Sequence, residues 1–134
     1  MDTITLIMLV AGWAGMLAGG LSGAAIGLFF HDERWMGGYS SFRRRLTRLG
    51  HISFFGLGFL NSLFALTRHL ASLPGKLGGV AAGALLVGAV TMPTCCFLSA
   101  WRKPFRHLFA VPVVAVMGGV TLTLATLLGA GGAS

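Results

Sequence analysis

The sequence predicts an all-α integral membrane protein, a bundle of four transmembrane helices that forms one domain over residues 1–134. Of its 134 residues, 55% are hydrophobic and only 10% are charged, and the mean hydropathy is +0.84. A soluble domain of this size could not bury so much apolar surface. The apolar residues also form four runs that are long enough to cross a bilayer as helices. These runs cover about 4–30, 49–70, 77–100 and 106–128, and the residues SLPGK at 72–76 predict a turn between the second and the third.

Basic residues are distributed unevenly over the three connecting loops. The first loop and its flanks carry five arginines, and the third loop carries Arg102, Lys103 and Arg106, whereas the second carries only Arg68 and Lys76. Positively charged loops are retained on the cytoplasmic side of a membrane. We therefore expect the first and third loops in the cytoplasm and both termini outside it. Abundant Arg, Gly and Ala point to a bacterium, and hence to its inner (plasma) membrane.

The net charge of +7 would suggest nucleic-acid binding in a soluble protein. Here the charge lies in short loops between apolar runs, so we expect the lipid bilayer as the partner, with anionic head groups at the arginine-rich loop, and no nucleic acid. The cysteines, Cys95 and Cys96, are adjacent inside an apolar run, where a disulfide between them would be strained.

A row of small residues marks the first run as a packing helix. Glycine recurs at every fourth position, at Gly15, Gly19, Gly23 and Gly27. Such spacing lets the backbones of two membrane helices approach closely. The pattern predicts a helix–helix contact, but the partner could be this chain, a second copy or another membrane subunit.

The second run has a polar face that a lipid-exposed helix would not need. His51, Ser62 and His69 fall on one side of the predicted helix, and Asn61 lies at the edge of that face near mid-membrane. Intramembrane polar groups usually face the protein interior. We expect Asn61 to hydrogen-bond a neighbouring helix.

Three histidines fall at the same predicted membrane boundary, His31, His51 and His107. Two histidines from different helices could hold a haem b iron, and Arg48, one turn before His51, could pair with a propionate. His107 is the preferred second ligand, because His31 stands beside two acidic residues. The more ordinary interpretation is that these histidines bond to head groups, water or helix ends. A metal site without haem is not expected.

Polar chemistry is otherwise scarce. The acidic residues, Asp2, Asp32 and Glu33, all lie outside the four runs, and the sequence contains no catalytic triad pattern, phosphate-binding loop or HExxH motif. We therefore expect no autonomous catalytic activity. The best interpretation is a small integral subunit of a larger membrane complex, most plausibly a respiratory or electron-transfer complex. The alternatives are a homo-oligomeric channel or small transporter, and a membrane assembly factor.

Overall fold

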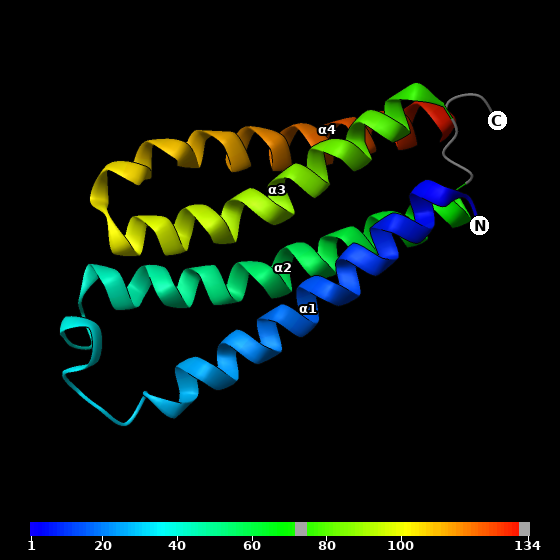
Figure 1. Ribbon diagram of the computed structural model, residues 1–134. Helices are drawn as coiled ribbons and strands as arrows, with labels where there is room; N and C mark the ends of the chain where they lie inside the picture. Colours follow the sequence, from blue (N-terminus) through cyan, green and yellow to red (C-terminus); the bar gives the residue numbers. More distant parts are fainter. Residues whose placement is uncertain (72–74, 132–134) are drawn as a thin grey trace.

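The protein is an array of four long helices, described by a computed structural model over residues 1–71 and 75–131 (Figure 1). The predicted turn at 72–76 has its residues 72–74 outside the described ranges. The α-helices are α1 (Thr3–Leu28), α2 (Phe42–Leu70), α3 (Lys76–Trp101) and α4 (Ala110–Gly131), with short 3-10 helices η1 (Trp35–Gly37) and η2 (Lys103–Phe109). All four α-helices, α4 together with η2, are long and apolar enough to cross a membrane. The predicted all-helical fold, with four helices long and apolar enough to span a membrane, is thus confirmed.

The helices pack in the order of the sequence instead of closing into a ring. The large contacts join α1 to α2, α2 to α3 and α3 to α4, and a smaller one joins α1 to α3. The beginning of α1 and the end of α4 lie at one end of the array, and the first and third loops lie at the other (Figure 1). We call the latter the basic end, because its loops and helix termini hold eight of the ten basic residues: Arg34, Arg43, Arg44, Arg45, Arg48, Arg102, Lys103 and Arg106. Its assignment to the cytoplasm stays a prediction.

The hydrophobic core lies between α1, α2 and α3, toward the end of the array where α1 begins. Met8 of α1 contacts a cluster formed by Phe64 and Ala65 of α2 and by small and branched residues of α3. Ala81 and Ala82 bring α3 close, and Leu85 fills the space beside them. Alternating large and small side chains in this way lets three helices share one core without voids.

Helix α2 begins seven residues earlier than the apolar run predicts. The sequence analysis placed Arg43 to Arg48 in the first loop, but these residues form the first two turns of α2. Ser41 caps the helix, since its hydroxyl accepts a hydrogen bond from the backbone N–H of Arg44 at 3.2 Å. Arginine is a good helix former, and its long side chain can leave the apolar zone, so charge does not end the helix here.

Candidate functional site

Glycines hold α1 and α2 in close contact along most of their length. Gly12, Gly15, Gly19 and Gly23 of α1 all face α2, and Gly58 of α2 faces back toward α1. A Cβ added to Gly58 would lie 2.7 Å from the carbonyl oxygen of Gly12. At such distances only a residue without a side chain fits. We call this contact the glycine seam.

The glycine seam accounts for three of the four glycines in the predicted row. A Cβ on Gly15 would lie 3.2 Å from Gly58 Cα, one on Gly19 would lie 2.5 Å from the Phe55 ring, and Gly23 adjoins His51. The position of Gly27 differs, because no atom lies within 4 Å of its added Cβ. The seam instead extends in the other direction, to Gly12, which the period of four did not include. The partner of the row lies within the same chain.

His51 is part of the glycine seam. Its Nδ1 lies 3.2 Å from the hydroxyl of Ser22 on α1, and its ring meets the Phe55 ring edge to face with 6.0 Å between centroids. A Cβ on Gly23 would lie 2.5 Å from Cε1 of His51 and 3.1 Å from Nε2. The ring therefore fills the space that Gly23 leaves, and its contacts are those of a packing residue that hydrogen-bonds a neighbouring helix.

The other predicted haem ligands lie elsewhere. His31 and His107 are exposed, as is His69, and within the described ranges no three metal-ligating residues form a group. His107 belongs to η2, which packs against α3 and α4, whereas the His51 ring contacts α1. Arg48 lies 5.4 Å from the centroid of the Tyr39 ring. Within the described ranges these residues are not brought together, and haem binding stays a prediction.

Asn61 and Ser62 are polar groups inside the apolar span. Asn61 is 1% exposed, and its Nδ2 has no hydrogen-bond partner among the described residues; the same is true of the Ser62 hydroxyl. Ser62 lies against Gly12 in the glycine seam. We expected Asn61 to hydrogen-bond a neighbouring helix, but among the described residues its Nδ2 makes no such bond, and the side chain is buried inside the chain.

Arg44 is the most deeply buried charged residue and organises the first loop. It is 0% exposed, and its guanidinium donates hydrogen bonds to the carbonyl oxygens of Phe30 at 3.1 Å and Asp32 at 3.3 Å. The rings of Phe30, Trp35 and Tyr39 surround it, with centroids 4.5–5.5 Å from Cζ. These carbonyls follow the end of α1, where the helix dipole favours a cation. The sequence analysis did not single out Arg44 from its neighbours.

The first loop, which surrounds Arg44, contains a residue in an unusual backbone conformation. Met36 has φ of +57°, a left-handed conformation that is rare for a residue with a side chain. The Ser41 hydroxyl donates to the Met36 carbonyl oxygen at 2.7 Å, and the Thr47 hydroxyl lies 3.4 Å from the Met36 sulfur. Neighbouring α2 residues thus hold the strained turn in place.

An ion pair joins α1 to α2 at the opposite end of the array. Asp2 caps α1 by accepting from the Thr5 N–H at 2.8 Å, and it also accepts two bonds from Arg68, the shorter at 2.6 Å. The Arg68 guanidinium, aided by the bonds from Thr5, holds the pKa of Asp2 well below its usual range.

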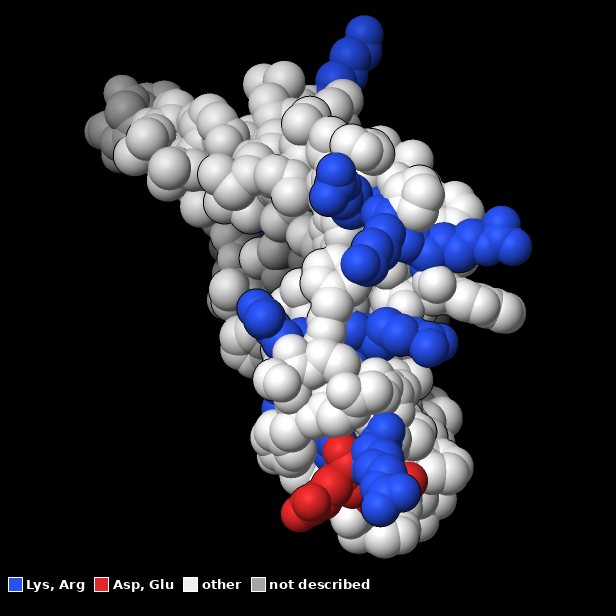
Figure 2. Space-filling model, turned by 90° about the vertical axis from the view of Figure 1, so that its left-hand side faces the viewer, with Lys and Arg blue, Asp and Glu red and all other residues white. Residues whose placement is uncertain are grey.

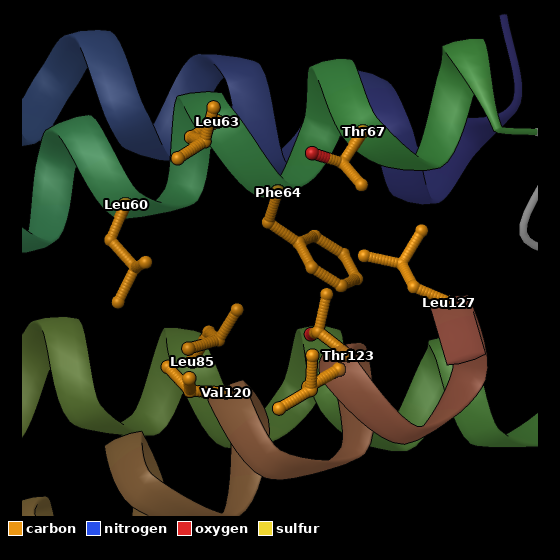
Figure 3. Close-up of a pocket in the computed structure, with 9 residues that line it drawn as sticks. Leu60, Leu63, Phe64, Thr67, Leu85, Val120, Thr123 and Leu127 are labelled. Atoms are coloured by element: carbon orange, nitrogen blue, oxygen red, sulfur yellow. The ribbon is translucent and has the colours of Figure 1, made fainter.

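An apolar groove of about 230 Å³ lies between α2 and α4, and α3 contributes Leu85 to its lining (Figure 3). Figure 3 shows Phe64 of α2 turned toward Thr123 and Leu127 of α4. Because α2 and α4 share no extensive contact, the two helices do not close this groove. It is lined by Leu60, Leu63, Phe64, Thr67, Leu85, Val120, Thr123, Leu124 and Leu127. We call it the α2–α4 groove.

Comparison of the chain with family models, with curated proteins and with solved structures found no match.

Proposed function

We propose that this chain is a small integral membrane subunit whose α2–α4 groove receives a transmembrane helix of another subunit. The observation that carries the proposal is the open packing of the helices in series. Of the apolar stretch of the η2–α4 segment only 11% is buried, against 39% for α3. A helix added in the groove would contact α2, α3 and α4 together and would complete the partly formed layer.

Small residues that do not line the α2–α4 groove support the subunit part of the proposal, because they offer further surfaces for helix packing. No atom lies within 4 Å of a Cβ added to Gly83 of α3 or to Gly118 of α4. Glycine inside a helix lowers the stability of that helix by about 1 kcal/mol relative to alanine, and contact with lipid does not offset this loss. Glycines in uncovered positions are typical of surfaces that pack against further helices.

In its narrower form, the proposal places the chain in a respiratory or electron-transfer complex of a bacterial inner membrane. This rests on the histidines at the basic end and on Arg48 one turn before His51. Reduced-minus-oxidised spectra of the purified assembly test it. A haem b band that His51→Ala removes supports the redox role, and spectra without such a band contradict it.

The subunit proposal is tested by purification from the native membrane in a gentle detergent, with mass spectrometry of the associated chains. Val120→Trp would fill the α2–α4 groove, and Val114→Trp, at a residue 71% exposed that does not line the groove, is the matched control. We expect a stoichiometric membrane partner that wild type and Val114→Trp retain and Val120→Trp loses. Isolation of the wild type alone, or as a ring of identical chains, would contradict the proposal.

A further inference from the structure

The basic end carries more positive charge than the chain can neutralise. Figure 2 shows Lys and Arg side chains spread over this end, with the acidic atoms gathered at one margin. The acids there are Asp32, whose carboxylate accepts from the Arg34 N–H at 2.9 Å, and Glu33. The third acid of the chain, Asp2, binds Arg68 at the opposite end. Counter-charge for most of the basic end must therefore come from outside the chain.

Two hollows place part of this charge beside apolar surface. The first, of about 450 Å³, lies along α2 and is lined by Phe42, Arg45, Leu46, Arg48, Leu49 and Ile52. The second, of about 400 Å³, lies between α2 and η2 and is lined by Phe42, Leu46, Lys103, Arg106 and Phe109. Because both include Phe42 and Leu46, they form one surface, which we call the basic groove.

The order of residues along the basic groove matches the chemistry of a phospholipid. Arg45 lines the first hollow, and Lys103 and Arg106 line the second. None of these three side chains has a hydrogen-bonded or ion-paired partner within residues 1–71 and 75–131. Leu49 and Ile52 continue the floor toward the middle of the α2 span, and both are about half exposed or more. A phosphate at the cations would place an acyl chain on these side chains.

From this arrangement we propose that the basic groove is a binding site for an anionic phospholipid. Its phosphate is held by Arg45, Lys103 and Arg106, and its acyl chain lies on Leu46, Leu49 and Ile52. Arginine near a membrane surface attracts anionic lipid, and several basic residues around one hollow can bind a single head group. The site does not depend on the proposed subunit function, because it lies on α2 and η2 away from the lining of the α2–α4 groove.

Native mass spectrometry of the purified full chain tests the site, with dioleoyl phosphatidylglycerol and dioleoyl phosphatidylcholine as probes. The variant Arg45→Gln/Arg106→Gln removes two charges from the groove. The control Arg34→Gln/Lys76→Gln removes the same charge from positions that do not line it. We expect one phosphatidylglycerol to bind tightly to wild type and control, and about 30-fold more weakly to the groove variant. Phosphatidylcholine should bind wild type no better than it binds the variant.

A further arm separates a lipid site from a simple phosphate site. Soluble glycerol 3-phosphate, which has the anion but no acyl chain, should not displace the lipid at millimolar concentration. Effective displacement would overturn the lipid assignment and leave a site for free phosphate compounds. Equal phosphatidylglycerol binding by the groove variant and the control would also overturn it, and would leave the cations for an acidic segment of a protein partner.

Discussion

The two helical hairpins, α1–α2 and α3–α4, are held by different kinds of contact, although each begins with a glycine-rich helix. In the first, glycines on both helices bring backbone against backbone, as Gly58 does with the Gly12 carbonyl. Polar links add to this along the whole length of the hairpin. Asp2 binds Arg68 at one end, Ser22 contacts His51 further along, and Arg44 holds the loop at the basic end.

The second hairpin is packed by branched side chains that enter glycine positions. Gly88 of α3 faces Val116 of α4, and Gly119 of α4 faces Leu85 of α3, where an added Cβ would lie 2.7 Å from the leucine Cγ. The hydroxyls of Thr91, Thr94, Thr123 and Thr126 donate to carbonyls of their own helix. Within the described part of the chain, no side-chain hydrogen bond joins α3 to α4.

This difference indicates which of the two hairpins can change its helix packing. Backbone contacts and polar links fix both the distance and the register of α1 against α2. Contacts between side chains can adapt by rotamer changes, so α4 can shift on α3 at small cost. We infer that the α1–α2 hairpin is the rigid part of the molecule and that α4 is the helix able to adjust its packing.

The largest effect is expected for Arg44→Ala. The substitution removes two charge-assisted hydrogen bonds and the cation at the centre of three rings, which together contribute about 3 kcal/mol. The neighbouring Arg45→Ala is the control, because Arg45 is exposed. Unfolding followed against SDS concentration should show the loss in the first variant alone. Equal stability of the two variants would mean that the loop is not held by Arg44.

A glycine in the seam should be the next most sensitive position. Gly58→Ala would push a methyl group against the Gly12 carbonyl and the Met16 N–H, and we expect a loss of about 1–3 kcal/mol. Gly56→Ala on the same helix meets no atom within 4 Å and should be neutral or slightly stabilising. Truncating a side chain cannot relieve a clash with backbone, so Met16→Ala should fail to restore Gly58→Ala. Restoration would show that this hairpin also adjusts.

The matching experiment in the second hairpin should give the opposite result. Gly88→Ala places its methyl group against a methyl group of Val116, with an expected loss of about 1 kcal/mol. Because the obstacle is a side chain, Val116→Ala in the same molecule should recover more than half of the loss. A double-mutant cycle of SDS unfolding measures this coupling. Additive losses would remove the proposed distinction between the two hairpins.

The smallest effect concerns pH. The lowered pKa of Asp2 means that its ion pair stabilises the folded chain at pH values above the usual aspartate pKa of about 3.9. This contribution is lost as the pH falls from that value toward the lower pKa of the folded state. Wild type should therefore lose stability on acidification below pH 4, and Asp2→Asn should be slightly less stable at pH 7 and lack that contribution to the acid loss. Parallel acid profiles for the two proteins would contradict the assignment.

Hydropathy was sufficient to predict the four helices, since apolar runs of this length have few other structures open to them. It misplaced the beginning of α2, because Arg43 to Arg48 are charged and only their helix propensity and the cap at Ser41 indicate the true boundary. Glycine spacing identified a packing row but not its partner or its extent. The contact at Gly12, one turn before the predicted row, depends on the angle at which α2 crosses α1. The spacing of residues along one helix does not indicate that angle.

The sequence also could not rank the arginines. The three consecutive arginines have the same charge and similar neighbours in the sequence. Which of them is buried depends on how the first loop folds back over α2. The tight turn at Met36 and the aromatic residues that surround Arg44 come from that loop. The histidine positions predict a shared depth along the membrane normal, but they do not indicate which helix each ring contacts.

The three consecutive arginines of α2 point in three different directions. Successive helix residues point about 100° apart. Arg43 accordingly donates to the Ala100 carbonyl at the end of α3 at 3.2 Å, Arg44 donates to carbonyls beyond the end of α1, and Arg45 lines the basic groove. Inserting one residue after Arg45 would rotate all three side chains by about 100° relative to the rest of α2. Arg43 and Arg44 therefore join the C-terminal ends of α3 and α1 to the same turn of α2, so that the ends of both neighbouring helices are fixed relative to the beginning of α2.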